Sequence, residues 1–147
     1  MKVAIGSDHR GFRAKSVVKS VLLSLGHDVL DLGPSDSQSC DYPDMAFPTA
    51  RAVINGQAER GILMCGTGIG MSIAANKTRG IRAALCHDEL TARLSRQHQD
   101  ANILCLPADL VGEELIRRIV EAWLETTFEG GRHARRVDKI ASQEEGC

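Results

Sequence analysis

Short apolar runs alternate with amphipathic segments along the chain, and this alternation constrains the possible folds more than any other feature. Apolar runs of strand character occur at residues 3–5, 29–32, 61–64, 82–85 and 102–106. Helical periodicity is found at residues 12–25, 45–54, 69–76, 89–98 and 111–128. Continuous apolar strands separated by helices are typical of a parallel sheet covered by helices on both faces. The sequence therefore predicts an α/β fold with three layers, α/β/α, around a five-stranded parallel sheet.

The size and charge of the chain limit what it can bind. Its 147 residues, 43% of them hydrophobic, fit a single domain spanning 1–147, in which we expect the polar end from about 141 to 147 to fray. With 18 basic and 19 acidic residues, the chain has no overall attraction for nucleic acid or an anionic membrane. No apolar run approaches the roughly 20 residues of a membrane span, and the first run is too short for a signal peptide. We therefore expect a cytoplasmic protein with neither nucleic acid nor a membrane as partner.

The most distinctive motif is the segment CGTGIG, from Cys65 to Gly70. Alternate glycines after a buried strand let several N–H groups point at one spot, which favours an anion there. The spacing matches neither the dinucleotide fingerprint nor the Walker loop, so a nucleotide role is the runner-up. A thiol beside such donors is suited to moving a proton on a carbon next to a carbonyl, because the donors stabilise the enediolate. A tight turn in which Cys65 only packs explains the motif equally well.

Other polar residues follow the predicted strands or occur near the end of the chain. Asp8 is expected to cap the helix that begins near His9, and its place at the strand end also makes it a candidate to hold a substrate hydroxyl. His98 is a candidate for proton transfer to a sugar ring oxygen, although a solvent-facing position or an interaction with the dipole at a helix C-terminus explains it equally well. Arg132 and Arg136 share one helix face suited to clamping a phosphate, yet taken alone a solvated basic face is the simpler reading.

The cysteines and the acidic residues do not form a recognisable metal site. The five cysteines are widely spaced and lack a Cys-x-x-Cys pair, so we expect neither disulfides nor structural zinc. Acid/base enolisation needs no metal. We therefore expect no metal and no other cofactor.

Six motifs together resemble the family of sugar-phosphate isomerases that includes ribose-5-phosphate isomerase B. They are GSDHRGF at 6–12, DYP at 41–43, CGTGIG at 65–70, SIAANK at 72–77, SRQH at 95–98 and EGGRH at 129–133. The resemblance spans nearly the whole chain. The wider family also includes galactose-6-phosphate isomerase subunits and isomerases of allose and tetrulose phosphates.

The resemblance implies a Rossmann-like domain that forms a homodimer or a tetramer, with the active site at the subunit interface. It implies that Cys65 transfers the proton between C1 and C2, and that Thr67 and His98 assist ring opening. Substrate binding is implied for Asp8, His9, Tyr42, Gly66, Gly68, Ile69, Gly70, Ser72, Asn76, Gln99, Arg132 and Arg136. His98, with or without the two arginines, is expected to come from the partner subunit.

Two positions depart from the pattern of the family. Gln99 stands where relatives commonly have asparagine, which changes the reach of an amide expected near the substrate. Asp109 stands where relatives usually have an arginine that helps to hold phosphate. Either Asp109 turns away and the phosphate rests on His9, Arg132 and Arg136, or the substrate differs in length or placement from ribose 5-phosphate.

The leading prediction is an aldose–ketose isomerase that converts ribose 5-phosphate to ribulose 5-phosphate through a cis-enediolate. One alternative is an isomerase of a tetrulose, allose or galactose phosphate. A second is a non-catalytic protein that binds a sugar phosphate or a nucleotide. A third is a subunit that is active only with a different partner chain.

Overall fold

A computed structural model describes residues 1–146 and shows one five-stranded sheet between two layers of helices. The strand order is β2-β1-β3-β5-β4, and every neighbouring pair is parallel. The strands are β1 (Lys2–Ser7), β2 (Asp28–Asp31), β3 (Arg60–Cys65), β4 (Ala83–Leu85) and β5 (Ile103–Pro107). The helices are α1 (Phe12–Ser24), α2 (Tyr42–Ile54), α3 (Ile69–Ala75), α4 (Glu89–Gln99), α5 (Glu113–Glu125) and α6 (Arg132–Glu145).

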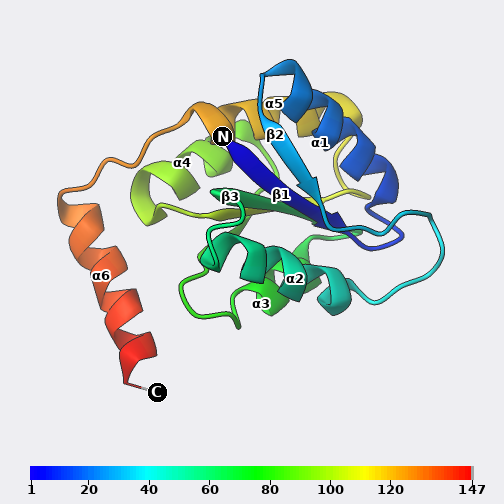
Figure 1. The fold of residues 1–147 in the computed structure, drawn as a ribbon. Coiled ribbons are helices and arrows are strands. Elements are labelled where there is room, and N and C mark those ends of the chain that lie inside the picture. The colour runs from blue at the N-terminus through cyan, green and yellow to red at the C-terminus, as the bar shows by residue number, and fades with distance from the viewer. Residues whose placement is uncertain (147) are drawn as a thin grey trace.

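The helices divide between the two faces of the sheet, as Figure 1 shows. On one face α1, α4 and α5 pack together over a core that includes the fully buried Trp123 and Leu22. On the other face α2 and α3 cover a second cluster that includes Leu63 and Met71. The central strands are apolar on both sides because both faces are covered. The predicted three-layer α/β/α fold is thus confirmed.

Helix α2 begins earlier than its periodicity predicted, and this matters for the site. The apolar pattern placed its start at Met45, whereas the helix begins at Tyr42. Pro43 lies in the first turn, where the missing N–H of proline costs no intrahelical hydrogen bond. The result is that Tyr42 is the first residue of α2 rather than part of a loop.

Helix α6 stands apart from the body, beside the ends from which the strands begin (Figure 1). Residues 141–145, in the end that the sequence predicts to fray, belong to this helix, and Cys147 lies outside the described residues. The helix is tied down near its end, because the Gly80 N–H donates to Glu144 Oε2 at 2.8 Å and Arg79 donates to the Glu144 carbonyl. Within residues 1–146, no helix combines the length and the apolar character needed to cross a membrane.

Candidate active site

A hollow of about 370 Å³ opens at the carboxyl edge of the sheet, where β1 and β3 end side by side. Ligands of open parallel α/β sheets bind at this edge. Its walls come from the loop after β1, the start of α2, the glycine loop after β3 and the loop after β5. The residues that line it are Asp8, Arg10, Tyr42, Cys65, Gly66, Thr67, Gly70 and Asp109.

Cys65 is the last residue of β3, and its side chain borders the hollow although the residue is only 4% exposed. The Gly68 N–H donates a hydrogen bond to Cys65 Sγ over 3.1 Å. Gly68 adopts the left-handed conformation, with φ of 73°, that turns this N–H back toward the sulfur. In residues 1–146, the N–H groups of Gly66 and Thr67 have no hydrogen-bond acceptor, which leaves them for a ligand.

Asp8 does not cap α1 as expected. The helix begins at Phe12 with Gly11 as its N-cap residue. Asp8 Oδ1 instead accepts hydrogen bonds from the N–H groups of Arg10, at 2.9 Å, and Gly11, at 3.0 Å. These two donors hold the buried carboxylate at the wall of the hollow in a fixed orientation.

Tyr42 lies directly against the glycine loop. A Cβ atom added to Gly70 would lie only 2.7 Å from Tyr42 Cζ, so a side chain at position 70 would displace the Tyr42 ring. Thr67 is exposed, and its hydroxyl accepts a hydrogen bond from the Ile69 N–H at 3.3 Å. Ile69 and Ser72 lie on α3 close to these residues but do not line the hollow.

His9 is half-buried beside the hollow rather than in its wall. Its Nδ1 atom lies 3.2 Å from the Cys40 carbonyl oxygen and 3.3 Å from the Cys40 nitrogen. The main chain before α2 therefore fixes the position of the imidazole.

Asp109 does not turn away from the site. Its N–H donates to the Gly66 carbonyl at 2.9 Å, and its Oδ2 atom lies 2.5 Å from Arg10 Nε. Arg10 was not predicted as a site residue, although it directly follows Asp8 and His9 at the end of β1. That position alone was the signal that could have identified it.

The structure separates three predicted site residues from this hollow. Helix α4 follows β4 and runs back against the strand direction, so His98 near its end lies at the amino edge of the sheet. Arg132 and Arg136 lie on α6, which stands at the same edge (Figure 1). Because β3 has six residues, about 17–20 Å separates the two edges. Within one chain, these three side chains therefore do not reach Cys65.

His98 stacks on His133 at this amino edge. The ring centroids are 4.2 Å apart and the rings are nearly parallel, at 8°. Glu129 lies 3.4 Å from His133 Nε2, and the ligand atoms of all three residues fall within 4.8 Å of one another. A metal ion must lie in the plane of each imidazole that binds it, and two stacked parallel rings do not share such a point. The arrangement is therefore an imidazole pair beside a carboxylate, not a preformed metal site.

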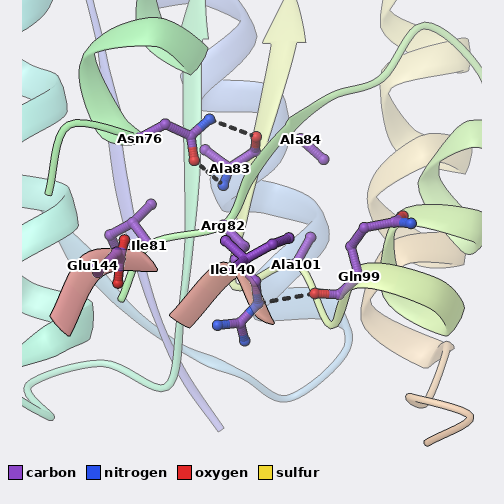
Figure 2. A pocket seen from close by; sticks show the side chains of 9 residues that line it. All are labelled: Asn76, Ile81, Arg82, Ala83, Ala84, Gln99, Ala101, Ile140 and Glu144. Atoms are coloured by element: carbon purple, nitrogen blue, oxygen red, sulfur yellow. Dashed lines mark hydrogen bonds between the residues drawn. The ribbon is translucent and has the colours of Figure 1, made fainter. Parts of the chain in front are cut away.

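Asn76 and Gln99 line a second cavity, of about 330 Å³, between α6 and the edge strand β4 (Figure 2). Both ends of the Asn76 amide are occupied, because Nδ2 donates to the Ala83 carbonyl at 2.9 Å and Oδ1 accepts from the Ala83 N–H at 2.8 Å. The Gln99 carbonyl accepts from Arg82 Nε at 2.9 Å. Asn76 thus holds the edge strand in place and lies outside the hollow of Cys65.

The fold and the hollow define a Rossmann-like α/β protein with a candidate acid/base thiol at the carboxyl edge of its sheet. A model of the family described as ribose/galactose isomerase matches residues 3–140. Ribose-5-phosphate isomerase B of Escherichia coli is 47% identical over 144 residues, covering 98% of this chain and 97% of the relative.

Solved structures agree with this match. The structure of Clostridium thermocellum ribose-5-phosphate isomerase B has a TM-score of 0.98 and 49% identity, with 99% of each chain covered. That of the Mycoplasma genitalium enzyme with bound ribulose 5-phosphate has a TM-score of 0.95 and 44% identity, covering 99% of this chain and 97% of the other. The chain belongs to the ribose/galactose isomerase family.

Proposed function

We propose that this chain is an aldose–ketose isomerase that interconverts ribose 5-phosphate and ribulose 5-phosphate, with Cys65 as the acid/base residue. The observation that carries the proposal is the position of Cys65 Sγ, which borders the hollow and accepts the Gly68 N–H at 3.1 Å. The family match supports the reaction class, and the ligand of the M. genitalium structure supports the choice of sugar.

The geometry suits proton transfer along a sugar. The Cys65 thiolate takes the proton from C2 of the open-chain aldose, and the electron pair moves into the carbonyl to form the enediolate. The hydroxyl proton on O2 passes to O1, and the thiol then returns its proton to C1, which yields the ketose with its carbonyl at C2. The free N–H groups of Gly66 and Thr67 stabilise the oxyanion as it forms. Asp8 and Tyr42, on the walls of the hollow, hold the hydroxyl groups.

We propose further that a second copy of the chain completes each site, in a homodimer or a dimer of dimers. His98, Arg132 and Arg136 lie at the opposite edge of the sheet from Cys65, so they can act on the same sugar only from another subunit. In that arrangement His98 and Thr67 assist ring opening, and the arginines bind phosphate. Mixing inactive Cys65→Ala protein with inactive His98→Asn protein, with subunit exchange, should restore activity. Failure to restore it in verified mixed dimers would contradict shared sites.

A cytoplasmic location is part of the same proposal. Cys40, Cys65, Cys86 and Cys105 are all free thiols. A reducing compartment keeps such thiols reduced, as proton transfer by Cys65 requires.

The test of the function is a panel of tetrose, pentose and hexose phosphates assayed with the purified protein and without added metal. Ribose 5-phosphate should give the highest kcat/KM. A higher kcat/KM for another sugar phosphate would identify that sugar as the substrate. Binding without turnover would favour a non-catalytic protein that binds sugar phosphates. Activity of the purified chain alone would exclude the need for a different partner chain.

A further inference from the structure

We propose that Arg10, held in place by Asp109, binds the phosphate group of the substrate at the mouth of the Cys65 hollow. This inference rests on the proposed function, because it concerns how the same site selects a phosphorylated sugar. It adds a residue whose role the sequence did not predict.

Arg10 has both the position and the free donors that such a role requires. Its side chain lines the hollow and is 61% exposed, so a ligand can reach it. A guanidinium carries five N–H donors in a rigid fork. In the part of the chain that the structure describes, only Nε of Arg10 is engaged, by Asp109 Oδ2. The four donors on the two terminal nitrogens remain available, and this fork matches a phosphate.

Asp109 fixes the guanidinium next to the reacting thiol. The Asp109 N–H is bound to the Gly66 carbonyl, so the loop after β5 is fastened to the residue that follows Cys65. A Cβ atom on Gly66 would lie 2.6 Å from Asp109 Oδ2 and 3.0 Å from Arg10 Nε. The ion pair therefore rests directly on Gly66, at the rim of the hollow. Orientation before binding lowers the entropic cost of holding a long side chain on a ligand.

The two acidic residues of the hollow also make a positive charge necessary for binding phosphate there. Among its eight lining residues, two are acidic, Asp8 and Asp109, and Arg10 carries the single positive charge. The Asp8 carboxylate is partly neutralised by two N–H donors, and that of Asp109 by Arg10. The hydrogen bond and the charge of Asp109 raise the pKa of Arg10, which keeps the guanidinium protonated. Without Arg10, a phosphate dianion would meet an unpaired Asp109.

The chain offers a matched control in a second ion pair of the same kind. Arg13 Nε lies 2.7 Å from Glu113 Oε1, and this pair likewise joins the start of α1 to the region of α5. Arg13 is 89% exposed and does not line the hollow. Loss of Arg13 therefore reproduces the loss of a surface ion pair without removing a cation from the site.

The experiment measures KM and kcat for ribose 5-phosphate with wild type, Arg10→Ala, Arg10→Lys and Arg13→Ala. Loss of hydrogen bonds to a charged group should raise KM about 10- to 100-fold in Arg10→Ala with kcat within about threefold, because uniform binding is lost. Arg10→Lys should lie between Arg10→Ala and wild type, since lysine keeps the charge but lacks the fork. Arg13→Ala should leave both constants within about twofold.

A double variant tests the second part of the inference, that Arg10 masks Asp109. In Arg10→Ala the bare Asp109 carboxylate repels phosphate, so Arg10→Ala/Asp109→Ala should have a lower KM than Arg10→Ala. A KM of Arg10→Ala within twofold of wild type would overturn the proposal, and so would an equal loss in Arg13→Ala.

Inorganic phosphate separates a failure of this inference from a failure of the proposed function. Calorimetry measures the dissociation constant of inorganic phosphate without any turnover. In Arg10→Ala this constant should rise, as KM for ribose 5-phosphate does. If wild type isomerises sugar phosphates and Arg10→Ala binds phosphate equally well, only the role of Arg10 is wrong. If wild type isomerises none of the sugars, the proposed function is wrong, while the calorimetry still decides whether Arg10 binds phosphate.

Discussion

Replacing Gly68 by alanine tests whether the loop beside Cys65 is as tightly constrained as the structure indicates. Gly68 has a φ of +73°, and a Cβ atom there would lie 2.5 Å from Leu85 Cδ1 and 3.1 Å from the Leu106 carbonyl carbon. Leu85 has a flexible side-chain end that can rotate away. Leu106 cannot yield in the same way, because the contact is with the backbone of the buried strand β5.

Two costs add in this variant. A non-glycine residue in the left-handed region costs about 1–2 kcal/mol. Forcing an extra carbon into a packed site costs about 1–3 kcal/mol more. We therefore expect Gly68→Ala to lower the free energy of unfolding by about 2–5 kcal/mol. Activity should also fall, because any shift of residue 68 moves its N–H away from Cys65 Sγ.

Gly56→Ala is the matched control. Gly56 has nearly the same φ, +72°, but a Cβ atom there would meet nothing within 4 Å. The free energy of unfolding of Gly56→Ala should therefore fall only by the cost of the left-handed backbone, about 1–2 kcal/mol. The variant should keep its activity. Urea unfolding of both variants gives the comparison. If Gly68→Ala were no less stable than Gly56→Ala, the close packing of the loop would be refuted.

Two further predictions concern the region of α4, α6 and the edge strand. Asn76→Ala loses two hydrogen bonds to Ala83, so urea unfolding should show a loss of about 1–3 kcal/mol; an unchanged midpoint would contradict the role of Asn76 as a clamp. Burial, and then the charges of His98 and Arg132, lower the pKa of His133 below its usual value of 6.5. The unfolded chain therefore takes up this proton more readily, and stability should be complete above pH 6.5 and fall as the pH is lowered through it. Thermal unfolding at a series of pH values should show a smaller acid loss in His133→Gln, and an identical loss would contradict the assignment.

The layered fold was predictable because its signal is local and repeated. Each buried strand is a short apolar run, and each helix has its own period, so the order of elements indicates a parallel sheet without knowledge of any long-range contact. The end of α6 was not predictable in this way. Residues 141–145 are polar, and their helix is held by contacts of Glu144 with residues 79 and 80, more than sixty positions away.

The site was predictable only in part. Cys65, Asp8 and Tyr42 were expected at one site from their motifs, and the structure brings them to one hollow. Whether they perform the predicted chemistry stays a prediction. Arg10 was missed because its value depends on Asp109, which is 99 positions away along the chain. The family resemblance implies that Asn76 binds the substrate, whereas its amide is occupied by Ala83, so that role stays a prediction.

The turnover of Cys65→Ala, measured together with its affinity for ribose 5-phosphate, tests the central proposal most directly. General acid/base catalysis contributes about 100- to 10,000-fold, so kcat should fall by that amount while the dissociation constant from calorimetry stays within about threefold of wild type. Turnover at the wild-type rate by a folded Cys65→Ala protein would show that another group moves the proton.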